Sequence, residues 1–453
     1  MPSDALVGTS VRDDTGIEYV LGAVIGKPGA QGVVYRVTGH PNLAIKLLTR
    51  SSELNRLEAV RRLPLEGLQL AAPLSLIRFG GSGYLMPLAS DMTPLAEPYL
   101  PREFGSRETS SINWYQNTGG LRRRLAIAAN VAQCLAGLHE RGLAYVDLNP
   151  NNVMVSDDLN RTETWLIDTD NLTSRSNPDP DSDILGFPGY VAPERIIKKA
   201  PPSTLADAYS LAVMVFRLLT LCHPLEGNAA ELLDGNSAKA AIGRGELAYV
   251  ADPADESNQL LPLSLSDKLF EVVVSGAMKK LLLKTFSGGR LDPVQRPGTA
   301  KWRDVLWHAL DNVVDCANNC GLTYYRLSTT CPSCGSKTPP VNLSSVFPEW
   351  GESEWDGVGP PARRTFVLSS QNATTVEGRH LWGSYDSKDP LLTFKPAKHG
   401  FALDVSDLVT AKDAQGRLID SIPHPKLRKE YRIHVSSSDR PTRILRITAL
   451  EVQ

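Results

Sequence analysis

Residues 145–155, YVDLNPNNVMV, and residues 165–170, WLIDTD, carry the pattern that decides the fold. In each stretch a carboxylate, Asp147 or Asp168, adjoins a run of apolar residues. An aspartate in a turn is usually a cap or part of an Asx turn, so each one alone says little. Their joint order says more, because Asp147 can accept the proton of a hydroxyl group, while Asn152 and Asp168 offer the oxygen ligands that Mg²⁺ prefers. The two stretches therefore predict a site for phosphoryl transfer.

Lys46 lies upstream, in an apolar run that predicts a strand over Asn42–Leu48. Burying a lysine costs free energy unless it meets an anion. One interpretation is an edge-strand lysine that points to solvent. The other is a cation for nucleotide phosphates, held by a carboxylate of the next predicted helix, Ser51–Leu63. Glu53 is preferred for that partner because it shares a helical face with apolar residues four and seven positions later, and Glu58 is the alternative.

A glycine-bearing turn, residues 25–35 with the sequence IGKPGAQGVVY, separates two β-branched runs, Tyr19–Ile25 and Val33–Val37. The two runs predict a hairpin. Glycines in its turn let backbone N–H groups approach phosphate oxygens without interference from a Cβ atom. Alone, this pattern favours a plain turn, since glycine-rich hairpins are common.

The surrounding sequence alternates short β-like runs with amphipathic stretches, which is typical of an α+β domain. Two more runs, Leu74–Phe79 and Tyr84–Leu88, complete a predicted sheet of about five strands. A long amphipathic helix is predicted at Leu121–Arg141, and a nearly all-apolar, buried helix at Ala206–Leu221.

The order of a glycine-rich loop, a strand lysine, a helix glutamate, a D-L-x-P-x-N loop and a strand-end aspartate resembles the motif set of the eukaryotic-type protein kinases. Residues 186–194, GFPGYVAPE, are similar to the segment that closes the activation loop in that family. Asp207 is similar to the aspartate that braces the catalytic loop, and residues 223–224 and 296–297 match two later motifs. The resemblance spans roughly residues 18–312. It implies a two-lobed fold, with a β-rich N-lobe and a helical C-lobe, and an ion pair between Glu194 and Arg296.

The resemblance implies an ATP- and Mg²⁺-dependent kinase that transfers the γ-phosphate to Ser or Thr hydroxyls of proteins, including its own. Residues 86–88 fall where that family grips adenine. The implied catalytic residues are Asp147, Lys46, Glu53 and Asn149; the nucleotide-binding residues are Gly26, Gly29, Gly32, Val34, Lys46, Met86 and Leu88; and the magnesium ligands are Asn152 and Asp168.

Several positions depart from the family pattern. The glycine loop is altered, because the step from Gly26 to Gly29 holds two residues where most kinases hold one, and the metal motif reads D-T-D where D-F-G is usual. Val146 replaces an arginine that a phosphorylated activation loop would neutralise, and Thr169 replaces the phenylalanine whose packing defines active and inactive states. These two changes predict activity that is constitutive or controlled by a partner. Asn149 replaces a lysine on the γ-phosphate and Phe187 a supporting threonine, so the transferring group loses charge stabilisation. A slow kinase is therefore predicted.

A cysteine module follows the kinase-like region. Cys316 and Cys320 form one closely spaced pair, and Cys331 and Cys334 form a second pair ten residues later. Four thiolates can close a tetrahedral zinc site, with each pair supplied by a short turn. With no open coordination position, the zinc is predicted to be structural.

The predicted domains are a kinase-like domain at 1–312, a zinc ribbon at 313–338, a linker at 339–363 and a β-rich C-terminal domain at 364–453. The linker is rich in Pro, Gly and Ser. The last region contains β-branched and aromatic runs that predict a small β-sandwich or barrel, with a docking role as a hypothesis. The predicted strands are Arg364–Ser370, His380–Tyr385, Leu391–Pro396, Phe401–Val405, Leu408–Lys412, Arg417–Ile419, Glu430–Val435 and Arg443–Val452.

Composition excludes several classes of protein. The chain has 453 residues, 42% hydrophobic and 22% charged, which excludes wholesale disorder and coiled coil. The net charge of −2 argues against a dedicated nucleic-acid or membrane-surface binder. No apolar run approaches the roughly 20 residues that span a bilayer, and the N-terminus lacks the order of a signal peptide. Together with the clustered cysteines, this predicts a cytoplasmic protein.

The details are similar to a bacterial subgroup of these kinases, encoded beside a PP2C-type phosphatase and a von Willebrand A-type protein in tellurite-resistance-like triads. That resemblance rests on the D-L-N-P-x-N loop, the I-D-T-D motif and the cysteine module. It implies those two proteins as partners, in addition to a protein substrate.

Two other functions stay open. A nucleotide-binding pseudokinase scaffold would explain the altered glycine loop, Asn149 and Phe187, but it need not keep Lys46 and Asp147. A small-molecule kinase of the aminoglycoside type shares the catalytic aspartate and the metal ligands, but residues 192–194 and Asp207 match a peptide-docking platform instead.

Overall fold

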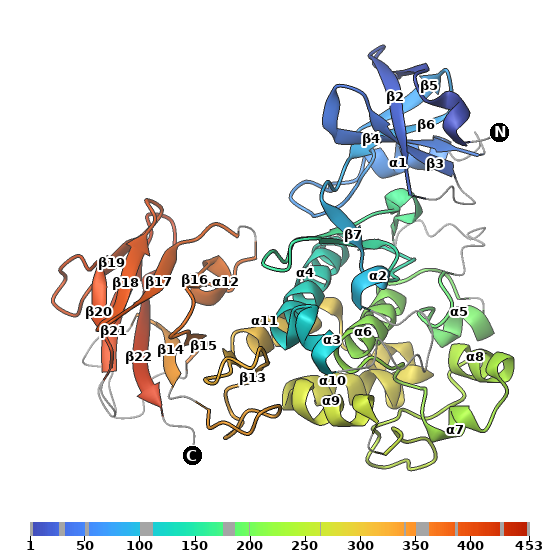
Figure 1. Ribbon diagram of the computed structural model, residues 1–453. Coiled ribbons are helices and arrows are strands. Elements are labelled where there is room, and N and C mark those ends of the chain that lie inside the picture. The colour runs from blue at the N-terminus through green and yellow to red at the C-terminus, as the bar shows by residue number, and fades with distance from the viewer. Residues whose placement is uncertain are drawn as a thin grey trace. The chain divides into compact units, whose positions relative to one another are not determined.

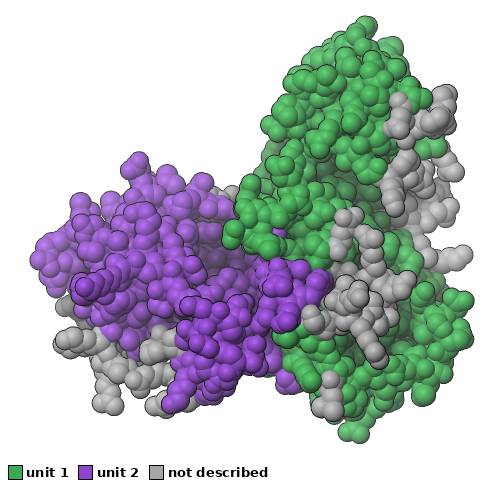
Figure 2. Space-filling view, in the orientation of Figure 1, with its two compact units in different colours: residues 1–112, 127–270, 276–303 green, residues 113–126, 271–275, 304–453 purple. Residues whose placement is uncertain are grey.

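A computed structural model describes residues 3–26, 32–49, 54–99, 112–174, 186–198, 200–262, 264–338, 341–349, 362–385, 388–425 and 430–450. The chain divides into two compact units, shown in Figure 2. Unit 1 comprises Met1–Ile112, Ile127–Phe270 and Gly276–Arg303, and unit 2 comprises Asn113–Ala126, Glu271–Ser275 and Asp304–Gln453. Each unit is described by itself.

Unit 1 begins with a closed β-barrel in the strand order β1-β2-β3-β4-β6-β5. The inward-facing side chains, among them Tyr35, Ile45 and Ile77, form one apolar core. The sheet prediction missed β1, in which Asp13 interrupts the apolar pattern; its buried carboxylate accepts hydrogen bonds from Thr15 and from the Tyr19 hydroxyl. The bounds are β1 Ser10–Asp13, β2 Glu18–Ile25, β3 Gly32–Val37, β4 His40–Leu48, β5 Ser75–Phe79 and β6 Gly83–Pro87, with a 3₁₀ turn η1 at Ser3–Leu6 and helix α1 at Leu54–Arg61 (Figure 1).

The rest of unit 1 is mainly helical, with short strands that carry the two motif stretches. β9 (Val153–Ser156) pairs with β10 (Thr164–Leu166) and β7 (Met92–Pro94), and β8 (Leu143–Ala144) pairs with β11 (Thr173–Ser174). This β-rich part followed by a helical part agrees with the predicted two-lobed α+β fold. The helices wholly in unit 1 are α2 Ala96–Tyr99, α5 Pro193–Ile197, α6 Thr204–Thr220, α7 Asn228–Glu231, α8 Gly235–Gly243 and α10 Gly276–Phe286, with 3₁₀ turns η3 Thr169–Asn171, η4 Gly288–Arg290 and η5 Pro293–Gln295. Three further helices contribute residues to both units, α4 Gly120–Glu140, α9 Leu265–Val273 and α11 Thr299–Leu310, and α3 Ile112–Asn117 lies almost wholly in unit 2.

Helix α6 is the buried centre of the helical part. Its N-cap, Ser203, accepts a hydrogen bond from the backbone N–H of Ala206, and Leu221 ends it in the left-handed conformation. The predicted ion pair between Glu194 and Arg296 is confirmed: two parallel hydrogen bonds of 2.7 Å join the buried side chains. This pair fixes α5 to the segment that follows η5.

In unit 2, the cysteine module packs on the start of α4. β12 (Val313–Asp315) pairs with β13 (Thr323–Tyr325). The Arg122 guanidinium lies 3.0 Å from the Asp315 carboxylate, and the Tyr325 hydroxyl donates to the Val273 carbonyl. These contacts place the module and segments from the kinase-like region in one compact body.

The C-terminal part of unit 2 has one sheet in the order β15-β14-β22-β21-β19 and another in the order β16-β17-β18-β20. Side chains from both, such as Phe366 and Phe394, share a single apolar core, as in a β-sandwich. The bounds are β14 Val341–Pro348, β15 Arg364–Leu368, β16 Thr374–Val376, helix α12 Gly378–Leu381, β17 Leu392–Ala397, β18 Gly400–Val405, β19 Thr410–Lys412, β20 Ser421–Pro423, β21 Glu430–Ser436 and β22 Arg443–Leu450.

Three segments differ from the sequence prediction. Strand β14 lies within the predicted linker and pairs along its length with β22, so the sheet begins before residue 364. The strand predicted at His380–Tyr385 is wrong: its first residues belong to helix α12. A capping box between Glu377 and His380 stabilises the start of that helix. Arg417–Ile419 lies outside the named strands and makes an isolated bridge through Leu418. Among the described residues, no helix has the length and apolar character needed to cross a membrane.

Candidate active site and candidate metal centre

Lys46 and Asp168, which are 122 residues apart, meet in unit 1. Lys46 lies in the middle of β4, opposite Val34 of β3 and Tyr84 of β6. Its ammonium donates to Asp168 Oδ1 at 2.8 Å and to Asp170 Oδ2 at 3.1 Å. The side chain of Lys46 is buried, as the cation interpretation requires, and the solvent-facing interpretation is excluded.

The charge of Lys46 is stabilised by its neighbours. Burial by itself lowers the pKa of a lysine. Here the neighbouring Tyr84 and the carboxylates of Asp170 and Asp168 outweigh burial and raise the pKa of Lys46 above its ordinary value. Lys46 is therefore a permanent cation at the centre of this cluster.

A short turn after β10 orients Asp168. Asp168 has left-handed backbone angles, φ 53° and ψ 50°, and it precedes the 3₁₀ turn η3. Thr169 is fully buried, and its hydroxyl donates to the Ala71 carbonyl at 3.0 Å. The Tyr145 hydroxyl donates to the carbonyl of Ile167, the residue before Asp168. These anchors hold the Asp168 carboxylate toward Lys46.

The Asp147 carboxylate is fixed by neighbours on both sides. The Asn149 Nδ2 group donates to Oδ1 at 3.1 Å, and the Asn152 Nδ2 group donates to Oδ2 at 3.2 Å. The backbone N–H of Phe187 adds a bond of 3.0 Å to Oδ1. Burial raises the pKa of Asp147 above its ordinary value, although these hydrogen bonds oppose the shift. A half-buried, oriented carboxylate of this kind suits a group that accepts a hydroxyl proton.

Gly186 makes the Phe187 contact possible. It has φ +96°, which side chains rarely adopt, and a Cβ atom there would lie 3.1 Å from Val191 Cγ2 and 3.4 Å from Asp147 Oδ1. The backbone can therefore approach Asp147 only at a glycine.

Helix α6 holds the loop that carries Asp147 through hydrogen bonds to its backbone. The carboxylate of Asp207 accepts hydrogen bonds from the backbone N–H groups of Tyr145 and Val146, at 2.7 and 2.9 Å, and lies 3.0 Å from His139 Nε2. Val146 has φ 80°, an unfavourable value for a β-branched residue. The clamp thus holds a strained backbone next to the candidate catalytic group, and it is the bracing contact that the resemblance assigns to Asp207.

The two motif stretches are joined directly. The backbone N–H of Ile167 donates to the Asn152 carbonyl at 3.0 Å. Since Asn152 turns its Nδ2 group toward Asp147, its side-chain oxygen is left to accept or to bind a cation. Asp168 and Asn152 together offer the hard oxygen donors that suit Mg²⁺.

The predicted nucleotide-binding side chains gather beside Lys46. Val34, Met86 and Leu88 pack in one apolar cluster with Ile167, the neighbour of Asp168. An apolar lining with a charged group at one end is typical of a nucleotide site.

The predicted glycines have different surroundings. Gly26 has φ +68°, and within the described part of the chain no atom lies within 4 Å of the place a Cβ atom would take. At Gly32, a Cβ atom would lie 2.2 Å from the Leu47 carbonyl oxygen, so the pairing of β3 with β4 itself requires glycine. Gly29 lies outside the described residues.

The helix glutamate that was predicted to pair with Lys46, Glu53, also lies outside the described residues. The alternative, Glu58, forms ion pairs with Arg62 and Arg78, at 2.8 and 3.2 Å. The carboxylate at Lys46 that the sequence prediction missed is Asp170. The I-D-T-D motif was the available signal, but the sequence does not tell which way the second aspartate points.

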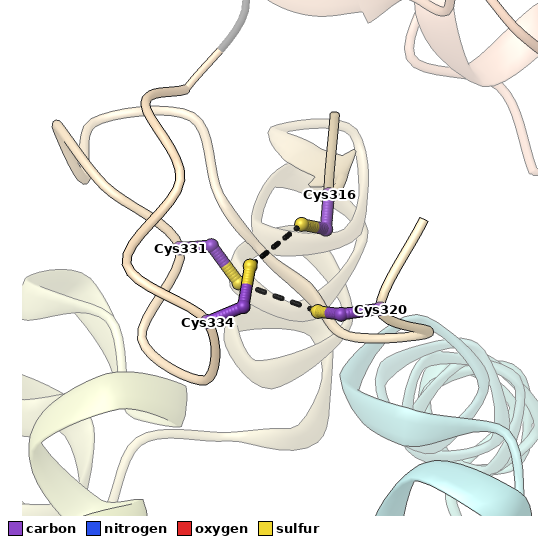
Figure 3. A group of neighbouring side chains, drawn as sticks. All are labelled: Cys316, Cys320, Cys331 and Cys334. Atoms are coloured by element: carbon purple, nitrogen blue, oxygen red, sulfur yellow. Dashed lines mark hydrogen bonds between the residues drawn. The ribbon is translucent and has the colours of Figure 1, made fainter. Parts of the chain in front are cut away.

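The candidate metal centre lies in unit 2, where two turns bring four sulfur atoms together (Figure 3). All four lie within 4.8 Å of one another, with Cys316 and Cys334 at 3.4 Å and Cys320 and Cys331 at 3.6 Å. Zn–S bonds of about 2.3 Å in a tetrahedron place sulfur atoms about 3.8 Å apart, so the spacing fits zinc. The cysteines are not joined by disulfides. The structure thus brings together all the cysteines of the predicted site.

Comparison with known proteins agrees with this geometry. Residues 108–307 match the family described as the protein kinase domain. A probable serine/threonine-protein kinase of Dictyostelium discoideum is 31% identical over 105 residues, which are 23% of this chain and 20% of the relative. Serine/threonine-protein kinase pkn2 of Myxococcus xanthus is 31% identical over 111 residues, 23% of this chain and 13% of the relative.

Serine/threonine-protein kinase PknD of Mycobacterium tuberculosis is 26% identical over 171 residues, 37% of this chain and 23% of the relative. The chain thus spans less than a quarter of the length of these three relatives. The matched region includes Asp147, Asn152, Asp168 and Glu194. Over residues 108–307 the chain is therefore similar to the protein kinase domain of the eukaryotic type, as found in serine/threonine-protein kinases.

Proposed function

We propose that this chain is an ATP- and Mg²⁺-dependent protein kinase that phosphorylates Ser or Thr hydroxyls of proteins, including its own. The observation that carries the proposal is the meeting of Lys46 with Asp168 in the same unit as the oriented carboxylate of Asp147. A cation for phosphates, a carboxylate for metal and a carboxylate for the attacking hydroxyl are the groups that phosphoryl transfer requires.

Each residue has a distinct part in the proposed reaction. Lys46 binds the phosphates, and the apolar cluster of Val34, Met86 and Leu88 holds the base. Asp168 and Asn152 would hold Mg²⁺, which neutralises charge on the transferring phosphoryl group when it is bound. Asp147 orients the acceptor hydroxyl and takes its proton. The glycine turn, with Gly26, Gly29 and Gly32, is proposed to cover the phosphates.

Asn149 has a positioning part in this proposal. Its Nδ2 group bonds to Asp147, and its Oδ1 accepts from the Asn151 backbone N–H at 3.0 Å, so the amide holds the loop together. An amide cannot supply the charge of the lysine that the family usually has there. A low turnover number follows, because a lost charge-stabilising contact costs on the order of 10²–10³ in rate.

The proposed activity is constitutive or controlled by a partner, and not switched by loop phosphorylation. Val146 supplies no cation for a phosphorylated residue. Thr169 is anchored in the core by its bond to Ala71, which supports a fixed metal motif.

The test is incubation of the purified full chain with radiolabelled ATP and Mg²⁺, with the phosphorylated residues mapped by mass spectrometry. Phosphate should appear on Ser or Thr, and Asp147→Asn should abolish it. Asp158→Asn is the matched control, because Asp158 is an exposed residue of the turn after β9. Transfer that persists undiminished in Asp147→Asn refutes the role of Asp147.

A pseudokinase scaffold is the second candidate, favoured by the absence of a lysine at Asn149. It predicts nucleotide binding with no phosphate transfer. A small-molecule kinase has less support, because the buried pair of Glu194 and Arg296 fixes the segment that resembles a peptide-docking platform.

We also propose that the four cysteines bind one structural zinc ion and that the C-terminal sheets serve in docking. Metal analysis should find one zinc per chain, and four thiols should become reactive when a chelator is added. Less than one zinc per chain would reject the site. The cytoplasmic location, and the phosphatase and von Willebrand A-type partners, stay predictions.

A further inference from the structure

Lys46 has two acidic neighbours that differ in how far solvent reaches them. The side chain of Asp168 is 39% exposed, whereas that of Asp170 is 9% exposed. Asp170 stands where the kinase family usually has a glycine, so this carboxylate is an addition to the usual motif. Its second oxygen, Oδ1, is buried and has no hydrogen-bond partner among the described residues.

The two carboxylates also differ in their place relative to the turn η3. Asp170 lies within the 3₁₀ turn η3 between Thr169 and Asn171, which are both buried, and Thr169 is bonded to Ala71. Asp168 precedes this turn and reaches solvent, so a cation can reach its carboxylate. If Asp168 held a cation, its carboxylate would serve two positive charges, and its attraction to Lys46 would weaken.

Lys46 would then need a second carboxylate that does not bind the cation. Only 5% of the Lys46 side chain is exposed. A buried ammonium without an anion is unfavourable. An ammonium has three N–H donors, so one carboxylate can hold it while another donor reaches a phosphate oxygen.

We propose that Asp170 is the positioning residue for Lys46, and that it does the work that the family resemblance assigns to Glu53. The inference deepens the proposed function and rests on it. Because Asp170 belongs to the turn that also carries Asp168, the alignment of Lys46 with the metal ligand is set within one short segment. The position of helix α1 then matters little for the position of Lys46.

The test compares two matched carboxylate-to-amide variants of the full chain, Asp170→Asn and Glu53→Gln. The dissociation constant for ADP is measured by calorimetry with and without Mg²⁺, and kcat and KM for ATP are measured where transfer occurs. Asp170→Asn should weaken ADP binding and lower kcat/KM by about 10- to 100-fold, as removing an orienting partner does elsewhere. Glu53→Gln should lower ADP affinity and kcat/KM by a smaller factor than Asp170→Asn does, and Glu58→Gln, at a carboxylate paired with Arg62 and Arg78, is the control that should stay within about threefold of wild type.

Other outcomes overturn the inference. The reverse pattern, with a large loss of ADP affinity in Glu53→Gln and none in Asp170→Asn, would show that Glu53 positions Lys46 and that Asp170 does not. Loss of ADP affinity only when Mg²⁺ is present makes Asp170 a metal ligand. A lower apparent kcat with unchanged KM and ADP affinity means that Asp170→Asn merely unfolds part of the protein.

A further variant covers failure of Asp170→Asn to fold. Asp170→Gly restores the residue usual in the family and should show the same loss of ADP affinity; wild-type affinity in that variant rejects the inference. Wild-type protein that binds ADP but transfers no phosphate rejects the proposed kinase activity, while the two binding comparisons still decide the role of Asp170. Wild-type protein that binds no nucleotide overturns both proposals.

Discussion

Two ion pairs in unit 1 join segments far apart in the sequence, and they are built in different ways. Arg296 and Glu194 meet through two parallel hydrogen bonds, and their side chains are 0% and 9% exposed. The Arg296 guanidinium is also bonded to the carbonyls of Gly289 and Leu205. This pair is closed, because solvent barely reaches either partner.

The pair of Lys46 and Asp168 is open by comparison. It has a single contact of 2.8 Å, and Asp168 is half-exposed with left-handed backbone angles. A bidentate arginine pair suits permanent structure, whereas a lysine acts as a point charge that can change partners. The comparison teaches that burial of both partners marks a structural pair, while one accessible carboxylate marks a pair that a ligand can rearrange.

The largest expected effect tests the closed pair. Glu194→Gln should lower the free energy of unfolding by about 3–5 kcal/mol, because it leaves the fully buried guanidinium of Arg296 without its anion. Denaturant unfolding of the full chain, followed by tryptophan fluorescence, measures this change. A change below about 1 kcal/mol would show that Arg296 does not depend on Glu194 as a buried ion pair requires.

The matched variant of the open pair is Asp168→Asn. It should change the free energy of unfolding by less than about 1 kcal/mol, since Lys46 keeps Asp170 and Asn tolerates left-handed angles. Phosphate transfer should nevertheless fall by on the order of 10²–10³. The contrast fails if Asp168→Asn unfolds the protein as readily as Glu194→Gln does.

A buried histidine, His223, differs from both ion pairs because its charge would change with pH. His223 is buried; it donates from Nε2 to the Gly189 carbonyl and accepts at Nδ1 from the Leu225 backbone N–H. Burial lowers the pKa of His223 to about 3. The unfolded chain binds the proton more tightly than the folded chain, so stability falls as pH drops below the unfolded value of about 6.5.

From pH 7 to pH 5 this histidine should cost about 2 kcal/mol of stability. His223→Asn should show a correspondingly flatter dependence of unfolding free energy on pH, whatever its absolute stability. His399→Gln, at an exposed histidine, serves as the control and should keep the wild-type slope. An equal slope in His223→Asn and wild type would contradict a neutral, buried His223.

The sequence predicted the parts of the site that are fixed by order and spacing. The cysteine cluster follows from the spacing of its two pairs. The resemblance to the protein kinases implied the pairing of Glu194 with Arg296, and the structure brings this pair together. Lys46 and Asp168 were each predicted as site residues, and the structure shows that they contact each other.

The sequence could not predict features that depend on side-chain orientation, strand pairing or capping in the folded protein. The side chain of Asp170 could equally have pointed to solvent, and only the turn η3 aims it at Lys46. Strand β14 was hidden because its flanks are rich in Pro and Gly, and only its pairing with β22 makes it a strand. Position His380 reads as strand by composition, yet its ring caps a helix. For β14 a contact distant in sequence overrides the local pattern, whereas at Asp170 and His380 a local turn or cap decides the conformation.

The smallest effect concerns the strained loop next to the open pair. At φ 80°, the β-branched Val146 carries a penalty of about 1–2 kcal/mol, and the clamp by Asp207 holds it there. Val146→Gly removes the steric penalty, while Val146→Ala keeps the Cβ atom that causes it. Glycine ordinarily destabilises a folded chain relative to alanine by about 0.5–1 kcal/mol. Here the order should reverse, with Val146→Gly more stable than Val146→Ala in denaturant unfolding; the usual order would mean that Val146 is not strained.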